Sequence, residues 1–156
     1  MKHGTLREYR IKGLALQESS RHPYVILEES VEGDTLTIRI GSSEATSLLL
    51  SLTGSVSPVP QIHDALAALI EQEHIQPEYL FINMLGTEES SAVLYYRKFM
   101  KHQSLRIKAA DGIALAFRLN IPICLSAEAI INATIHNPFH SMAAETNGSF
   151  LYIQGN

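Results

Sequence analysis

Residues 36–66 read LTIRIGSSEATSLLLSLTGSVSPVPQIHDAL, and the rest of the chain is predicted to be organised around them. From Leu36 to Ile40 apolar residues alternate with polar ones, a pattern that predicts a half-buried strand. The strand ends at Gly41, and a helix begins within two or three residues. Glu44 therefore falls in the first turn of that helix.

A second helix begins at Pro60, because a proline at the first helical position leaves no backbone N–H unpaired. His63 and Asp64 lie in its first turn. The apolar spacing predicts that this helix buries one stripe and turns Glu71 and His74 towards water. The predicted buried residues are Ile62, Ala65, Leu66, Leu69 and Ile70.

The same order of residues returns later in the chain. Residues 106–119 (RIKAADGIALAFRL) align with residues 39–52 (RIGSSEATSLLLSL), so that Glu44 and Asp111 occupy equivalent places. This match indicates an internal duplication of a β-β-β-α unit, although any two strand-to-helix junctions share part of this pattern.

The remaining periodicity predicts one α+β domain, with a mixed or antiparallel sheet packed by helices. The domain spans residues 1–131, and residues 132–156 form an irregular extension in which Phe150–Ile153 adds an edge strand. The predicted strands are 5–16, 24–29, 35–40, 79–85, 92–99, 104–108 and 122–125, and the predicted helices are 43–52, 60–74, 110–119 and 127–131.

Composition limits the class of protein. A chain of 156 residues with 46% hydrophobic and 18% charged residues suits one globular domain. One cysteine, Cys124, excludes an intrachain disulfide. The start of the chain has no apolar signal segment and no run suits a membrane helix, so we expect a cytoplasmic protein without a membrane partner. A homodimer is also expected.

Three acids are candidate functional residues. Asp111 opens a helix that is apolar nearly all round, so its carboxylate lies at the edge of the core and needs a partner. Glu44 and Asp64 lie in first turns, where an acid also serves simply to offset the helix dipole or cap the helix. His63 tends to stay neutral at a helix N-terminus, as a base or ligand requires.

A basic segment with aromatic residues covers residues 95–108, YYRKFMKHQSLRIK, and contains no acid. Phosphate contacts combined with base stacking on Tyr95, Tyr96 or Phe99 suit a nucleic-acid strand. A solvated pair of strands with aromatic residues in the core is the alternative. The five cations are Arg97, Lys98, Lys101, Arg106 and Lys108.

Three motifs carry a family resemblance: IGSSEA at residues 40–45, PQIHDAL at 60–66 and DGIALAFRLNIPI at 111–123. In order and spacing they resemble the bifunctional nuclease family, whose pattern reads IG-x-x-EA, RP-x-THDL and DSRPSDA followed by IALA. The resemblance covers roughly residues 6–131. Glu44, His63, Asp64 and Asp111 match residue for residue.

The chain also departs from that pattern. Val59 replaces the arginine before the helix proline, and Ile62 replaces the threonine. Residues 106–111 read RIKAAD where the family has DSRPSD, so an acid has become Arg106 and Lys108 stands for an arginine. Half of the polar motif is therefore missing.

The resemblance implies a nuclease that hydrolyses phosphodiester bonds of DNA and RNA. In that interpretation Glu44, Asp64 and Asp111 hold Mg²⁺ or Mn²⁺, which prefer oxygen ligands. His63 acts as base or ligand, and the basic segment 95–108 contacts phosphates. The alternative is a catalytically inactive binding or oligomerisation domain of the same fold.

Overall fold

The computed structural model describes residues 6–17, 21–86, 90–135 and 150–154. The strands are β1 (Arg7–Gln17), β2 (Pro23–Glu29), β3 (Thr35–Arg39), β4 (Gln76–Met84), β5 (Ser91–Lys98), β6 (Lys101–Lys108), β7 (Ile123–Leu125) and β8 (Phe150–Gln154). The helices are α1 (Ser42–Leu52), α2 (Ile62–Gln72), α3 (Ala109–Leu119) and α4 (Ala127–Ile135).

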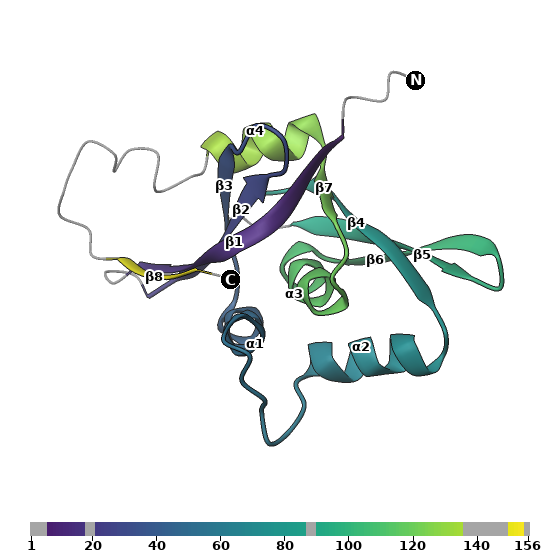
Figure 1. Ribbon diagram of the computed structural model, residues 1–156. Coiled ribbons are helices and arrows are strands. Elements are labelled where there is room, and N and C mark those ends of the chain that lie inside the picture. The colour runs from purple at the N-terminus through teal and green to yellow at the C-terminus, as the bar shows by residue number, and fades with distance from the viewer. Residues whose placement is uncertain (1–5, 18–20, 87–89, 136–149, 155–156) are drawn as a thin grey trace.

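All eight strands join one sheet, which confirms the predicted α+β class. Their order is β3-β2-β1-β7-β4-β5-β6, and β8 pairs with β1. Every pair is antiparallel except β4 with β7, which is parallel. Helices α1, α2 and α3 lie on one face of the sheet and α4 lies on the other (Figure 1).

Each half of the sheet is a three-stranded meander followed by a helix, β1-β2-β3-α1 and β4-β5-β6-α3. The short strand β7 joins the halves, because it pairs with β1 on one side and β4 on the other. This order matches the predicted β-β-β-α units but does not confirm a duplication. The predicted extension 132–156 begins inside α4 and contributes β8, while residues 136–149 lie outside the described ranges.

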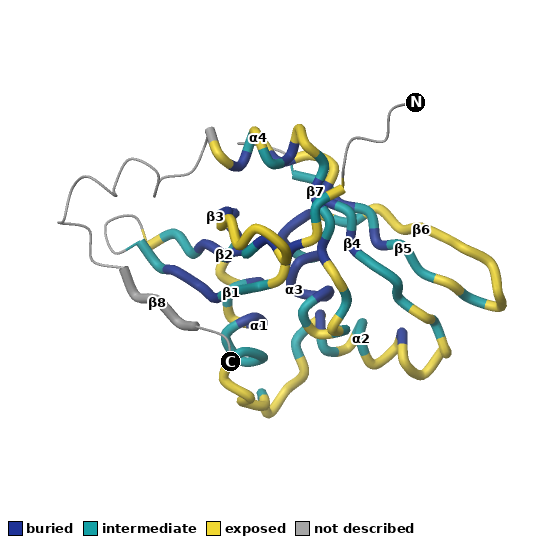
Figure 2. The backbone as a smooth tube through the Cα atoms, turned by 45° about the horizontal axis from the view of Figure 1, so that its top comes forward, coloured by how far each residue is buried: buried dark blue, intermediate teal, exposed yellow. Residues whose placement is uncertain are grey.

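Helix α3 is the centre of the core (Figure 2). Seven of its residues are buried, as its apolar sequence predicts. Gly112 allows the close approach of the helix to the sheet, since a Cβ there would lie 2.9 Å from Leu80 Cδ1 and 3.1 Å from Ile107 Cγ2.

The predicted orientation of α2 is right in part. Ile70 is buried, Leu66 packs against the core, and Glu71 and His74 are exposed, as predicted. Ile62 and Leu69, however, are 71% and 52% exposed, and His63 is buried in their place. The sequence of α2 offers apolar residues on more than one side, so periodicity alone does not select the inner side. The helix packs mainly on α3, and a polar contact of His63 described below fixes which side faces inward.

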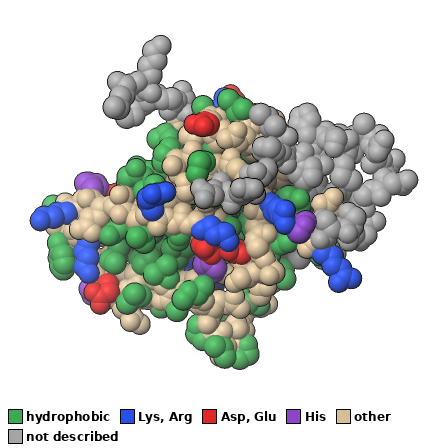
Figure 3. All heavy atoms as spheres, turned by 180° about the vertical axis from the view of Figure 1, so that it is seen from behind, with side chains coloured by type: hydrophobic (Ala, Val, Ile, Leu, Met, Phe, Trp, Pro, Cys, Tyr) green, Lys and Arg blue, Asp and Glu red, His purple; other side chains and the backbone are tan. Residues whose placement is uncertain are grey.

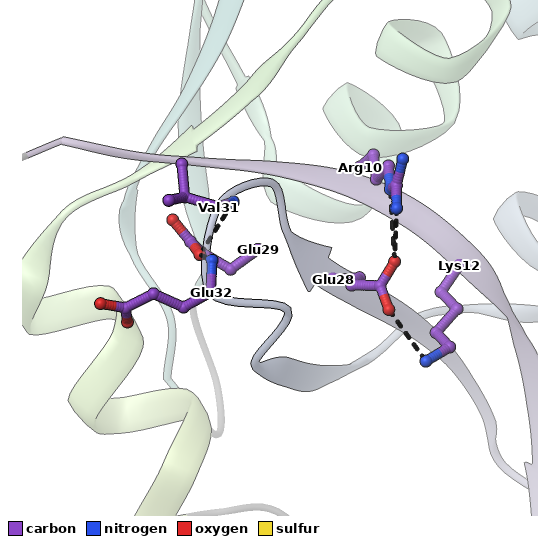
Figure 4. Close-up of polar contacts among 6 residues, drawn as sticks. All are labelled: Arg10, Lys12, Glu28, Glu29, Val31 and Glu32. Atoms are coloured by element: carbon purple, nitrogen blue, oxygen red, sulfur yellow. Dashed lines mark hydrogen bonds and ion pairs between the residues drawn. The ribbon is translucent and has the colours of Figure 1, made fainter.

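Charged side chains on β1 and β2 neutralise one another (Figure 4). Glu28 accepts hydrogen bonds from Arg10 Nη2 at 2.9 Å and from Lys12 Nζ at 3.0 Å. The buried Glu29 instead accepts the backbone N–H groups of Val31 and Glu32 and so closes the turn to β3. Strand β1 therefore presents little uncompensated positive charge.

The β5–β6 hairpin extends from the body of the molecule (Figure 1). Its two turn residues, Phe99 and Met100, have φ values of 49° and 64°. Such left-handed turns normally contain Asn or Gly, so Phe99 and Met100 carry no signal for a two-residue turn here. For that reason β6 begins at Lys101, three residues before its predicted start at Ser104.

Among the described residues, no helix combines the length and apolar character that crossing a membrane requires.

Substitution Gly112→Ala tests the packing of α3 against β4. In a solvent-exposed helix, Gly→Ala stabilises the folded protein by about 1 kcal/mol, because alanine has the higher helix propensity. Here the added methyl group meets Leu80, so we expect a net loss of about 1–3 kcal/mol in the free energy of unfolding, as overpacked cores show. Urea unfolding measures it, and a stabilised variant would contradict the close contact.

Candidate active site at the strand-to-helix junctions

Three helices share one arrangement at their N-termini. In each, the third helical residue is an acid, a position at which a carboxylate offsets the helix dipole by about 0.3–1 kcal/mol. The acids are Glu44 in α1, Asp64 in α2 and Asp111 in α3, after the N-cap residues Gly41, Gln61 and Lys108.

An ion pair joins the β3–α1 and β6–α3 junctions. Lys108 Nζ donates to Glu44 Oε1 at 3.0 Å, across 64 positions of sequence. Glu44 is only 5% exposed, and its carboxylate folds back over Gly41. A Cβ at residue 41 would collide with Glu44 Oε2, so this carboxylate position requires glycine there.

A second contact joins α2 to α3. His63 Nε2 lies 3.0 Å from Asp111 Oδ1. His63 is 3% exposed, and its Nδ1 atom is buried without a hydrogen-bond partner in the described part of the chain. A neutral imidazole that donates from Nε2 leaves Nδ1 as a bare acceptor. This contact explains why α2 turns a polar residue inward.

These contacts form one cluster of Glu44, Lys108, Asp111 and His63. Burial raises the pKa of Glu44, but hydrogen bonds from its own backbone N–H and from Lys108 outweigh burial, and a contact with Asp111 acts in the same direction. The pKa of Glu44 therefore lies below its ordinary value. The hydrogen bond to Glu44 raises the pKa of Lys108, so both members stay charged at neutral pH.

Asp64 lies apart from this cluster. Its carboxylate accepts the backbone N–H of Gln61 at 3.0 Å and pairs with Arg118 from the last turn of α3. Arg118 also donates to Ser51 Oγ at 3.2 Å. The structure thus brings Glu44 and Asp111 together, and gives Asp64 a helix-capping and ion-pairing position. Arg118 is not among the predicted site residues, because no local pattern links residues 64 and 118.

A cleft of about 820 Å³ lies between the two halves of the sheet. The strand-to-helix junctions line it through Gly41, Lys108, Ala109 and Ala110, whereas Glu44, Asp111 and His63 do not line it. Three cations line it, Arg39 from β3 and Arg106 and Lys108 from β6, and none of the described lining residues is acidic. In Figure 3, acidic, basic and histidine side chains lie together near the middle of the face.

The basic segment 95–108 divides into two parts. Arg106 and Lys108 line the cleft. At the hairpin end, Lys98 pairs with Glu73 at 3.2 Å and Arg97 lies 3.8 Å from Glu78. Lys101 has no ion-pair partner among the described residues. Arg39, which lies outside the basic segment, also lines the cleft but is not among the predicted site residues.

The arrangement does not fit a divalent cation as it stands. Within the described residues no three His, Cys, Asp or Glu side chains are close enough to hold a metal ion. The Lys108 ammonium group occupies one oxygen of Glu44, and Asp64 is turned to Arg118. Glu44, Asp64 and Asp111 as metal ligands therefore stay a prediction.

Cys124 is not a candidate nucleophile. It lies on β7 in the middle of the sheet, and burial raises the pKa of its thiol, so the thiol stays protonated.

Comparison with known proteins gives a family match. A model of a family described as the bifunctional nuclease domain matches residues 25–138, which include every residue of the cluster and of the basic segment. Two relatives, each described as an uncharacterised protein and found in two strains of Mycobacterium tuberculosis, are 26% identical over 137 residues. That alignment covers 86% of this chain and 80% of theirs.

Substitution Glu44→Gln tests the electrostatics of the cluster. Because the pKa of Glu44 is lowered on folding, its charge contributes stability that is present above the ordinary value of 4.5 and is lost as pH falls through the folded pKa. We expect the stability difference from the native protein to be largest at neutral pH and to shrink below pH 4.5.

Urea unfolding between about pH 3 and pH 7 measures this difference, since the effect follows the two pKa values of the carboxyl group. Lys108→Met is the partner variant. It removes one cause of the lowered pKa of Glu44, so the pH at which the stabilising effect of the Glu44 charge is half lost should move upward. A pH dependence that is unchanged in both variants would be the contrary result.

Proposed function

Because the chain belongs to the bifunctional nuclease domain family, we propose that it binds nucleic acid in the cleft and hydrolyses phosphodiester bonds there. The observation that carries the proposal is that Lys108, which lines the cleft beside Arg39 and Arg106, belongs to one cluster with Glu44, Asp111 and His63. Of the four residues that match the family motifs residue for residue, Glu44, His63 and Asp111 lie in this cluster and Asp64 does not.

Asp111 is the group best placed to accept a proton. Its side chain is 36% exposed, whereas its partner His63 is buried and cannot reach substrate. His63 is therefore a positioning residue that holds the carboxylate through Nε2. In this proposal Asp111 deprotonates the attacking water at the edge of the cleft, the role of a general base.

Lys108 supplies positive charge on the reacting phosphate. Its side chain is 62% exposed and both lines the cleft and contacts the buried Glu44. Glu44 thus fixes the ammonium group in place before substrate arrives, and pre-positioned charge stabilises a developing negative charge best. Arg39 and Arg106 lie along the same cleft and suit the neighbouring phosphates.

The sequence also predicts Mg²⁺ or Mn²⁺ held by Glu44, Asp64 and Asp111. The acid–base proposal does not depend on a metal. A metal site would require Lys108 to release Glu44 and Arg118 to release Asp64. A substitution at Asp64 therefore separates the two interpretations, because the acid–base proposal does not use it.

A domain that binds nucleic acid without cleaving it is the second candidate. It is favoured by the fact that each of the three acids already has a protein partner, Lys108, Arg118 or His63. Localisation in the cytoplasm and formation of a dimer stay predictions, and light scattering at several concentrations tests the dimer.

Cleavage of labelled single-stranded and duplex DNA and RNA tests the proposed function, in Mg²⁺, in Mn²⁺ and in EDTA. We expect Asp111→Asn to lower the rate about 100-fold or more, as loss of a general base does. Lys108→Met should cost about 100-fold or more, because charge stabilisation is lost.

Asp34→Asn, in the β2–β3 turn, is the matched control and should cleave at the native rate. Asp64→Asn should keep most activity if Asp111 acts as the base, and should lose it if the three acids hold a metal. Absence of cleavage by the native protein under all conditions would favour the binding domain.

A further inference from the structure

The face of β4, β5 and β6 that points away from α3 carries aromatic, polar and charged side chains, whereas the opposite face packs against the core. Ala92 and Leu94 point inward and are buried against the core. Because side chains alternate along a strand and paired residues share a face, the register identifies the outward residues. They include Tyr79 on β4, Tyr95 and Arg97 on β5, and Ser104, Arg106 and Lys108 on β6.

An aromatic pair lies in the middle of this outward face. The rings of Tyr79 and Tyr95 are stacked, with centroids 4.7 Å apart and planes inclined by 18°, and both residues are half-buried. On the other side of Tyr95, its cross-strand partner is Ser104, a small and exposed residue. A flat group therefore has space over Ser104 to extend the stack on Tyr95.

The charge around this pair suits a polyanion. Residues 90–108 contain no acid. Arg106 flanks Ser104 and has no ion-pair partner among the described residues, while Arg97 and His102 share Glu78 from β4. Seen from this side, basic and hydrophobic side chains lie together where the hairpin extends, at the left of Figure 3.

The outward face is continuous with the cleft. Arg106 and Lys108 lie on this face of β6 and also line the cleft. Residues two apart on a strand are separated by roughly 6.6 Å, so Ser104 lies roughly 13 Å from Lys108. A short segment of an extended chain spans that distance.

We propose that a single-stranded segment of nucleic acid leaves the cleft along the outward face of β6, with its backbone over Arg106 and a base stacked on Tyr95 above Ser104. The proposal rests on the proposed function, since the strand is the substrate that occupies the cleft. Only an unpaired base exposes the face that such a stack needs, so the arrangement selects a single strand over a duplex.

The alternation of β5 and β6 offers matched controls. Tyr96 follows Tyr95 but lies on the other face, where its hydroxyl donates to Gln103 at 2.9 Å. Lys101 carries the same charge as Arg106 and also lies on the other face by register. Tyr79→Leu/Tyr95→Leu is therefore compared with Tyr96→Leu, and Arg106→Gln with Lys101→Gln.

The experiment measures binding by fluorescence anisotropy, in EDTA, for three labelled probes of equal length: oligo-dT, an abasic sugar-phosphate oligomer and a DNA duplex. We expect oligo-dT to bind tightest. The double tyrosine variant should bind oligo-dT about 5-fold or more weakly, the loss expected for one stacked base, and should bind the abasic probe like the native protein. Arg106→Gln should lower the salt slope by about 1 for the oligo-dT and abasic probes alike.

The proposal is overturned if the tyrosine pair and Tyr96→Leu have the same effect, if oligo-dT binds no better than the abasic probe, or if no probe binds. It is also overturned if the tyrosine variant alters self-association in light scattering and not probe binding, which would assign the face to a second copy of the chain. Cleavage assays on the same variants keep the proposed function separate. If the native protein cleaves but the double tyrosine variant binds oligo-dT as well as the native protein does, only the stacking proposal is refuted. If the tyrosine substitutions weaken binding but the native protein does not cleave, only the proposed hydrolysis is refuted.

Discussion

The ion pair between Lys108 and Glu44 is the contact on which the site depends. It joins the two strand-to-helix junctions, which lie in opposite halves of the sheet. Because Lys108 is largely exposed, such a pair contributes roughly 0–1 kcal/mol of stability. Its importance is positional: it places an ammonium group at the edge of the cleft and holds it against a carboxylate that Gly41 leaves room for.

The fold brings these junctions together through α3. The helix is buried, packs closely on β4 at Gly112 and has α1 and α2 as its neighbours. Its first turn is therefore the place where α1 and α2 both reach, α1 through Glu44 to Lys108 and α2 through His63 to Asp111. A polar cluster that spans three helices then forms at the edge of one continuous apolar core.

Strands β1 and β6 differ in how their cations are paired. On β1, Arg10 and Lys12 are neutralised by Glu28. On β6, Arg106 faces the cleft without an acid. An acidic chain with a net charge of −4 thus concentrates uncompensated positive charge on one surface. That separation allows a polyanion to approach a protein whose overall charge would repel it.

The α+β class, the order of elements, the burial of α3 and the position of Glu44 and Asp111 in first helical turns follow from the sequence, because period, turn residues and helix starts are local properties. Which side of α2 faces inward does not follow from it, since His63 and Asp111 meet across 48 positions of sequence. Only the tertiary structure decided that Asp64 pairs with Arg118, that Arg39 joins Arg106 and Lys108 in the cleft, and that the hairpin turns at Phe99 and Met100. Partners of charged side chains are set by packing between distant segments, and no local pattern contains that information.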